Sequence, residues 1–129
     1  MTPYHVDTDV LVWGCAHPGP ERERLFRILD AGAPVAMSAW AWYEFQRGPR
    51  SPEQLAAAAV LLGDSGIVPV SADIAEEAGE VFRALGSPRS RAADILIGVT
   101  ARLCGATLLT RNAEDFAGID GLILEALVP

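Results

Sequence analysis

The stretch Val-Asp-Thr-Asp-Val-Leu-Val at residues 6–12 places two carboxylates inside an otherwise apolar run. A carboxylate in such a run is costly to bury unless it is hydrogen-bonded, paired with a cation or bound to a metal ion. We expect residues 4–12 to form a strand, on which Asp7 and Asp9 would point to the same face. A strand that ends in an aspartate turn or cap is the ordinary alternative. Asp7 is the stronger functional candidate, because Asp9 would serve equally well as a supporting hydrogen-bond acceptor.

Short apolar runs alternate with helical segments along the rest of the chain. Strand-like runs occupy residues 4–12, 34–37, 67–70, 106–109 and 122–127. Helical segments occupy residues 20–31, 38–47, 51–62, 71–85 and 91–104, with a loop at 86–90 and a turn or short helix at 112–116. Ser38, Ser51 and Ser71 are good N-caps for three of these helices. The alternation predicts an α/β protein with a parallel sheet and helices on both faces.

The chain has 129 residues, half of them hydrophobic, which fits one domain over residues 1–129 with a sizeable core. No apolar run approaches the ~20 residues that a membrane-spanning helix needs, and the first residues lack the basic and apolar parts of a signal peptide. We therefore expect a cytoplasmic protein without membrane contact. Cys15 and Cys104 form no zinc or disulfide pattern, and Cys104 is expected to lie in the core.

The formal net charge of −7 argues against a broad basic surface for nucleic acid. A group of acids that is neutralised by bound metal would account for part of this charge. All ten basic residues are arginine, so the sequence excludes a P-loop lysine, a Schiff-base lysine and a catalytic ammonium group.

Asp94 and Glu44 are single acids in segments that are otherwise apolar or aromatic. Asp94 lies near the start of an apolar helix, where the helix dipole favours an anion, and a purely structural role there is the alternative. Gly98, one turn later, is expected to leave space beside the Asp94 carboxylate. Glu44 stands among tryptophan, tyrosine and phenylalanine, and an ion pair with Arg47 is its structural alternative.

A strand followed by a polar turn places further candidates at the carboxyl end of the expected sheet, where ligands of such sheets bind. Asp115 is the acidic candidate, and Thr110 and Asn112 are supporting ones, although turns also favour Asp and Asn. Five arginines near the acidic motifs are candidates for phosphate contacts, with solvated surface as the alternative. These are Arg47, Arg50, Arg89, Arg91 and Arg111.

Four stretches, in this order, resemble the PIN-domain family, and most closely its toxin members of the VapC type. They are residues 6–12, the Ser38 helix that carries Glu44 before Arg47 and Gly48, residues 94–101, and residues 109–112 with Asp115 and Phe116. The resemblance spans almost the whole chain. It implies a single three-layer α/β/α domain with a central parallel sheet, often homodimeric, that cleaves RNA with one or two divalent ions.

The resemblance also implies roles for the acids of this chain. Asp7 and Asp94 would be the principal metal ligands, and Glu44 would bind metal or position water. Asp115 would complete the pocket, although some relatives carry this acid at the position of Asn112. Carboxylate ligands without a nearby His or Cys cluster suit Mg²⁺ or Mn²⁺ rather than zinc.

A toxin of this kind implies a cognate antitoxin, which would lay a helix or an extended segment across an apolar groove. Such a partner often places a basic side chain in the acidic pocket. Candidate groove residues are Trp13, Trp40, Phe82 and Leu85, for which core packing is the alternative.

Two other functions compete with the ribonuclease. Asp7 and Asp9 match the nucleophile and acid of haloacid-dehalogenase-like phosphatases, but Leu11 departs from that pattern and the chain has no lysine. The other alternative is a non-catalytic PIN-like module that binds RNA or a partner protein. A module of that kind would have no reason to concentrate carboxylates.

Overall fold

The computed structural model describes residues 1–127, so the last two residues of the expected domain lie outside it. Within this range, five strands form one sheet in the order β3-β2-β1-β4-β5, and every neighbouring pair is parallel. The strands are β1 (Tyr4–Val6), β2 (Val35–Ser38), β3 (Ile67–Val68), β4 (Thr107–Thr110) and β5 (Ile123–Ala126). The predicted α/β class with a central parallel sheet is confirmed.

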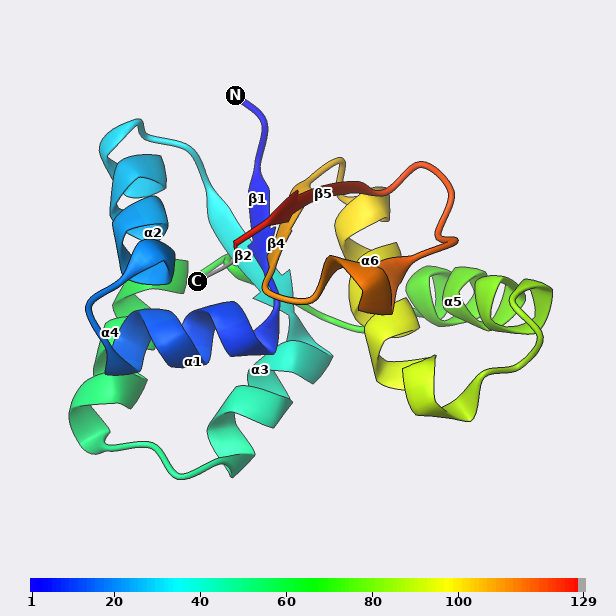
Figure 1. Ribbon diagram of the computed structural model, residues 1–129, viewed down its shortest axis with the longest axis horizontal. Helices are drawn as coiled ribbons and strands as arrows, with labels where there is room; N and C mark the ends of the chain where they lie inside the picture. The colour runs from blue at the N-terminus through cyan, green and yellow to red at the C-terminus, as the bar shows by residue number, and fades with distance from the viewer. Residues whose placement is uncertain (128–129) are drawn as a thin grey trace.

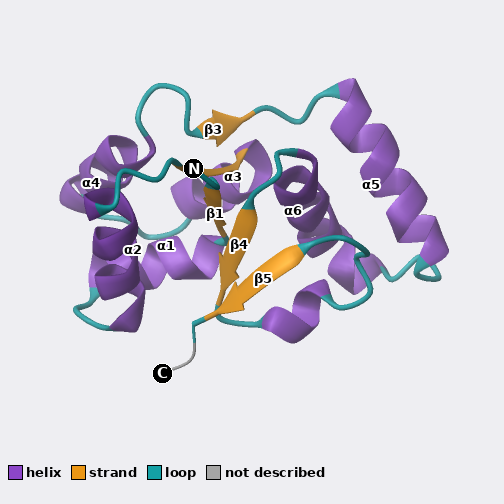
Figure 2. Cartoon of the chain, turned by 90° about the horizontal axis from the view of Figure 1, so that it is seen from above, coloured by secondary structure: helices purple, strands orange, loops and turns teal. Residues whose placement is uncertain are grey.

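Helices cover both faces of this sheet, as Figures 1 and 2 show from two directions. The α-helices are α1 (Thr8–Ala16), α2 (Pro20–Asp30), α3 (Ala39–Arg47), α4 (Pro52–Leu62), α5 (Ala72–Ala84) and α6 (Ala92–Leu103), and the 3₁₀ turns are η1 (Arg89–Arg91) and η2 (Ala113–Phe116). Helices α1, α2 and α4 gather on one side, and α5 and α6 pack together on the other. Helix α3 contacts both α1 and α6. The three-layer arrangement is therefore also confirmed. No helix in residues 1–127 is long and apolar enough to cross a membrane.

Serine caps start three of the helices where the sequence predicts. The Ser38 hydroxyl accepts from the backbone N–H of Trp40, and Ser71 does the same for Ile74. Ser51 and Gln54 form a capping box at the start of α4. Each cap satisfies a backbone donor that the helix itself leaves free, which fixes the point where the chain turns from strand or loop into helix.

The prediction of one strand over residues 4–12 is wrong after Val6. Asp7 is the N-cap of α1, and its side chain accepts from the backbone N–H of Thr8. Val10, Leu11 and Gly14 form the buried side of this helix, at helical spacing. Because α1 is apolar nearly all round, its periodicity is weak, and the β-branched run reads as a strand. Asp7 and Asp9 consequently lie at a helix start and not on one strand face.

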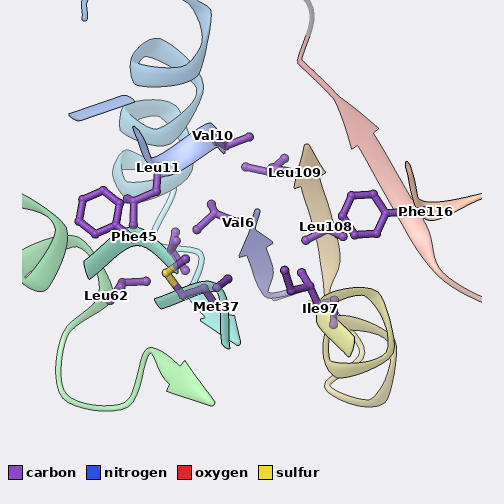
Figure 3. Packing of buried hydrophobic residues seen from close by; sticks show 14 of the residues in the cluster. Val6, Val10, Leu11, Met37, Phe45, Leu62, Ile97, Leu108, Leu109 and Phe116 are labelled. Carbon is purple, nitrogen blue, oxygen red and sulfur yellow. The ribbon is translucent and has the colours of Figure 1, made fainter. Parts of the chain in front are cut away.

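The core lies around β1 and β4, and Figure 3 shows the buried side chains that pack on either side of these strands. Val6, Leu108 and Leu109 of these strands are fully buried. Phe45 of α3 packs into the core on one side of these strands, and Phe116 of η2 packs into it on the other. The expectation that Cys104 belongs to this core is wrong: it follows the last residue of α6 and is an exposed free thiol.

Gly98 serves helix packing and not, as expected, the space beside Asp94. A β-carbon at this position would lie 2.8 Å from the Ile119 Cδ1 and 3.2 Å from both Leu122 Cδ2 and Phe116 Cδ1. The glycine therefore lets α6 approach the apolar segment around η2, so that the segment carrying Asp115 is held against α6.

Gly98→Val is expected to lower the free energy of unfolding by about 1–3 kcal/mol through overpacking. Gly79 in α5 is the matched control, because a β-carbon there would meet nothing closer than 3.8 Å. Gly79→Ala is expected to raise stability by roughly 0.5–1 kcal/mol through helix propensity. Urea unfolding of both variants measures the two signs, and a neutral Gly98→Val would contradict the packing role of Gly98.

Candidate active site

The strand order reverses between β1 and β4, because β2 and β3 lie on one side of β1 and β4 and β5 lie on the other. Open α/β sheets bind ligands at such a point, outside the carboxyl ends of the strands. Asp7 follows β1 directly, and Thr110 is the last residue of β4. The backbone N–H of Asp7 donates to the carbonyl of Leu109 at 3.0 Å, which fixes the acid at the strand end.

Asp7 is buried with hydrogen bonds on both carboxylate oxygens. Oδ1 accepts from the backbone N–H of Thr8 at 2.8 Å, and Oδ2 accepts from the Thr110 hydroxyl at 3.1 Å. Burial raises the pKa of Asp7 to about 7, helped by the charges of Asp9 and Asp94, although both hydrogen bonds act in the opposite direction. The carboxylate therefore carries negative charge that its surroundings do not fully compensate.

Glu44 reaches the same place from α3. Its Oε1 accepts from the Thr8 hydroxyl at 3.0 Å, and its Oε2 lies 3.7 Å from an Arg47 nitrogen. The ion pair expected as the structural alternative is thus present, but the contact with Thr8 ties Glu44 to the start of α1. Thr8 is a site residue that the sequence reasoning missed. Its position directly after an aspartate N-cap could have identified Thr8, but the prediction of a strand over residues 4–12 hid this cap.

Helix α6 and the turn η2 bring the remaining acids. Burial raises the pKa of Asp94 to about 6, and the charges of Asp115, Glu44 and Asp9 add to this, against Arg91. Asp94 and Asp115 line one pocket with Glu44 and Asp9, so the negative charges of these acids add to the effect of burial on Asp94.

One pocket of about 350 Å³ collects these side chains. It is lined by Asp7, Thr8, Asp9, Val12, Glu44, Arg47, Arg50, Asp94, Asn112 and Asp115. The four acids singled out in the sequence thus share one pocket with Asp9 and Asn112. Thr110 belongs to it through its hydrogen bond to Asp7.

The donor set of the pocket fits a hard divalent cation. Its carboxylates offer oxygen ligands of the kind that Mg²⁺ and Mn²⁺ prefer, and two of them have raised pKa values that a nearby cation would lower. Among residues 1–127, no three acidic, histidine or cysteine side chains already converge on one point. Side-chain rotation about fixed backbone positions would therefore have to complete a ligand set.

The five candidate arginines occupy different places. Arg47 and Arg50 line the pocket. Arg91 donates to the backbone carbonyls of Asp115 and Ala117, so it ties η2 to the start of α6. Arg89 is exposed on η1. Arg111 is not among the residues that line the pocket in the described chain.

A second, apolar groove of about 620 Å³ lies between α1, α2 and α4. It is lined by Gly14, Cys15, Arg22, Leu25, Phe26, Leu29, Ala56, Ala57, Val60 and Leu61. Phe26 is 59 % exposed and Val60 is 84 % exposed, although both are large and apolar. Such a surface is typical of a protein-binding site.

The four residues expected to line such a groove lie elsewhere. Trp13 packs under Arg111, and the ring of Trp40 packs against Tyr43 in a tilted arrangement. Phe82 and Leu85 are half-buried against the core. The groove is formed instead between α1, α2 and α4, and the spacing of its exposed apolar residues, such as Phe26 and Val60, did not separate them from core positions.

The PIN-domain family model matches residues 4–122, and the chain therefore belongs to the PIN-domain family. A comparison with curated protein sequences gives no match.

Solved structures with the same fold come from toxin–antitoxin complexes. A chain of VapBC2 from Rickettsia felis, bound to a promoter DNA fragment, is 24% identical with a TM-score of 0.76, over 98% of this chain and 99% of that chain. A toxin–antitoxin complex from Klebsiella pneumoniae contains a chain that is 28% identical, with a TM-score of 0.71 over 93% and 95%. DNA-bound VapBC from Salmonella typhimurium gives 19% identity and a TM-score of 0.74 over 98% of both chains.

Proposed function

We propose that this PIN domain is a divalent-metal-dependent endoribonuclease and the toxin of a type II toxin–antitoxin pair. The observation that carries the proposal is the pocket at the point where the strand order reverses, which holds Asp7, Glu44, Asp94 and Asp115 together. Membership of the PIN family and the likeness to chains of toxin–antitoxin complexes support the same function. The family match leaves no place for the haloacid-dehalogenase-like alternative.

Mg²⁺ or Mn²⁺, when bound, supplies positive charge that stabilises a phosphodiester group under attack and makes water more acidic. Asp7 and Asp94 would hold the ion, and Asp115 would complete the ligand set. Glu44 would bind the ion or hold a water molecule, and Thr8 fixes its orientation.

Positive side chains at the pocket would bind the RNA backbone. Arg47 and Arg50 line the pocket, so an RNA phosphate that enters it meets two guanidinium groups beside the acids. Arg89 is exposed on η1 and is a candidate for a contact outside the pocket. This local arrangement allows RNA binding in spite of the formal net charge of −7.

The antitoxin is proposed to occupy the apolar groove of α1, α2 and α4 with an apolar helix. A homodimer, which the family resemblance implies, and a cytoplasmic location, which the sequence leads us to expect, complete the proposal.

Phe26→Arg is expected to weaken binding of the antitoxin by roughly 30-fold or more, because it places a charge in the centre of an apolar contact. RNA cleavage should be unchanged, since Phe26 does not line the acidic pocket in the described chain. Ile123→Arg is the control, because Ile123 is 63 % exposed on β5, outside the groove. Co-expression with the product of a neighbouring small reading frame, followed by a pull-down, measures the effect. Equal capture of Phe26→Arg and wild type would contradict this placement.

Incubation of the purified protein with a mixed RNA pool tests the nuclease itself. Cleavage in Mg²⁺ or Mn²⁺ that EDTA stops is the expected result. RNA retention without cleavage in any metal would favour the non-catalytic binding module.

A further inference from the structure

Arg111 directly follows β4, yet it contacts two helices. Its guanidinium carbon lies 4.1 Å from the centre of the Trp13 ring in α1. Its Nε lies 3.8 Å from the Oε2 of Glu21, in the first turn of α2. Arg111, Trp13 and Glu21, here called the Arg111 cluster, therefore join the turn after β4 to both helices.

The Arg111 cluster is buried at its centre. Glu21 is 5 % exposed, and neither its Oε2 nor the Arg111 Nε has a hydrogen-bond partner among the described residues. A carboxylate buried in this way is costly unless a cation lies nearby, and the guanidinium is that cation. The aromatic face of Trp13 adds a cation–π contact. The charge of Arg111 is thus used inside the protein, which makes it a poor candidate for a phosphate contact.

Two of the three segments that the cluster joins, the turn after β4 and helix α1, also line the acidic pocket. Asn112, next to Arg111, donates its backbone N–H to the Thr110 hydroxyl at 3.0 Å and its side-chain amide to Asp9 Oδ2 at 3.4 Å. Trp13 lies one helical turn after Asp9 in α1. A shift of the turn relative to α1 would therefore change the distances between pocket groups on both sides.

We propose that Arg111 is a positioning residue, which clamps the turn after β4 against α1 and so sets the spacing of the oxygen ligands for a divalent cation. The inference rests on the proposed function, because it takes the acidic pocket to be the cation site. Substitution of a residue that holds metal ligands in place typically lowers metal affinity about 10–100-fold. Arg111 acts here through the turn that carries Thr110 and Asn112, and not by touching the cation or the RNA.

Arg24 provides a matched control. Its guanidinium carbon lies 5.3 Å from the centre of the Tyr4 ring, and its Nε lies 2.6 Å from the Oε2 of Glu125. This group has the same three kinds of side chain, but it joins α2 to β1 and β5, and none of its members lines the acidic pocket as described. Arg24→Met and Arg111→Met change the net charge equally, so their difference reports position and not overall charge.

Calorimetric titration with Mn²⁺ alone, at pH 8, tests the proposal. Arg111→Met is expected to weaken Mn²⁺ binding about tenfold or more, and Arg24→Met by less than about twofold, even where both lower the melting temperature. Adding Trp13→Leu to Arg111→Met should cause little further loss, because the two residues act as one unit. If Arg111→Met does not fold, Arg111→Lys carries the same comparison, since lysine keeps the charge without the planar contact.

An unchanged Mn²⁺ affinity in a folded Arg111 variant, or an equal loss in Arg24→Met, would overturn the proposal. A wild-type protein that binds no Mn²⁺ would instead count against the proposed function. In that case, the rate of amide hydrogen exchange at Asn112 still tests whether Arg111 holds the turn after β4 in place. Faster exchange in Arg111→Met than in Arg24→Met supports the clamp, and equal rates overturn it.

Discussion

Asp94→Asn is expected to lower metal-dependent RNA cleavage by about 100-fold or more, because a lost ligand removes several kcal/mol of charge stabilisation from the reaction. The same substitution is expected to make the metal-free protein more stable at pH 8. These two effects have one physical cause, which is the concentration of carboxylates at the carboxyl ends of the strands. Substitution of an ordinary surface acid is not expected to lower cleavage and raise stability together.

The gain in stability follows from the pKa of Asp94, which is raised from 3.8 to about 6 by burial and neighbouring acids. At pH 8 the carboxyl is ionised in both the folded and the unfolded chain, and the ionised form is the one that the fold disfavours. Asparagine removes this charge. After allowance for solvent screening, the gain is on the order of 1 kcal/mol, which raises the melting temperature by a few degrees.

Asp64→Asn is the control, because Asp64 is exposed in the loop after α4 and does not line the pocket in the described chain. It should change neither cleavage nor the melting temperature. Differential scanning calorimetry in EDTA and an RNA cleavage assay in Mn²⁺ measure the two effects. An Asp94→Asn variant that melts lower than wild type in EDTA would show that the acids do not repel one another as inferred.

Mn²⁺ binding is expected to strengthen steeply as the pH rises from 5 to 8. The pKa of Asp7 is raised to about 7 and that of Asp94 to about 6, so protons compete with the cation for both groups below these values. Each group costs up to about tenfold in affinity for every pH unit below its pKa, so the combined loss at pH 5 approaches roughly 1000-fold. Calorimetric titrations at four pH values between 5 and 8 measure it, and a flat profile would contradict the assignment of Asp7 and Asp94 as ligands.

Without metal, the pH dependence of stability has the opposite sign. Asp7 and Asp94 have folded pKa values above their unfolded values, so their contribution to stability is complete below about pH 4 and is lost as the pH rises through 6 and 7. Buried His5 opposes this at the acid end, because its pKa is lowered to about 4 and the fold loses stability as the pH falls from 6.5 to 4. In the metal-free Asp7→Asn variant, the free energy of unfolding should therefore no longer fall as the pH rises from about 6 to about 7. Its loss at acid pH, which is due to His5, should remain.

The sequence was sufficient for the order of elements after α1, because serine caps begin three of the helices and a glycine follows the end of most of them. It also singled out the acids that line the pocket, with Asp9 as a supporting one, since burial of a carboxylate in an apolar run is costly without a compensating cation or hydrogen bonds. Its failure at residues 8–16 has a physical reason: a helix that is apolar nearly all round has almost no polar face, so its helical period is hidden.

Two other features depend on tertiary placement, which one-dimensional spacing does not contain. Arg111 is adjacent in sequence to Thr110 and Asn112, so it was grouped with the phosphate-binding candidates, yet its guanidinium packs on Trp13. The apolar groove joins α2 to α4, and only the fold shows that Phe26 and Val60 border one cavity.

The most direct test of the central claim is a single cleavage time course on one RNA that the wild-type protein cuts in Mn²⁺. Wild type, Asp94→Asn and Asp64→Asn are purified identically and compared side by side. Cleavage by wild type and Asp64→Asn, with a loss of about 100-fold or more in Asp94→Asn, is the predicted result. Equal cleavage by all three proteins would contradict the claim, because it would show that the acidic pocket is not the catalytic site.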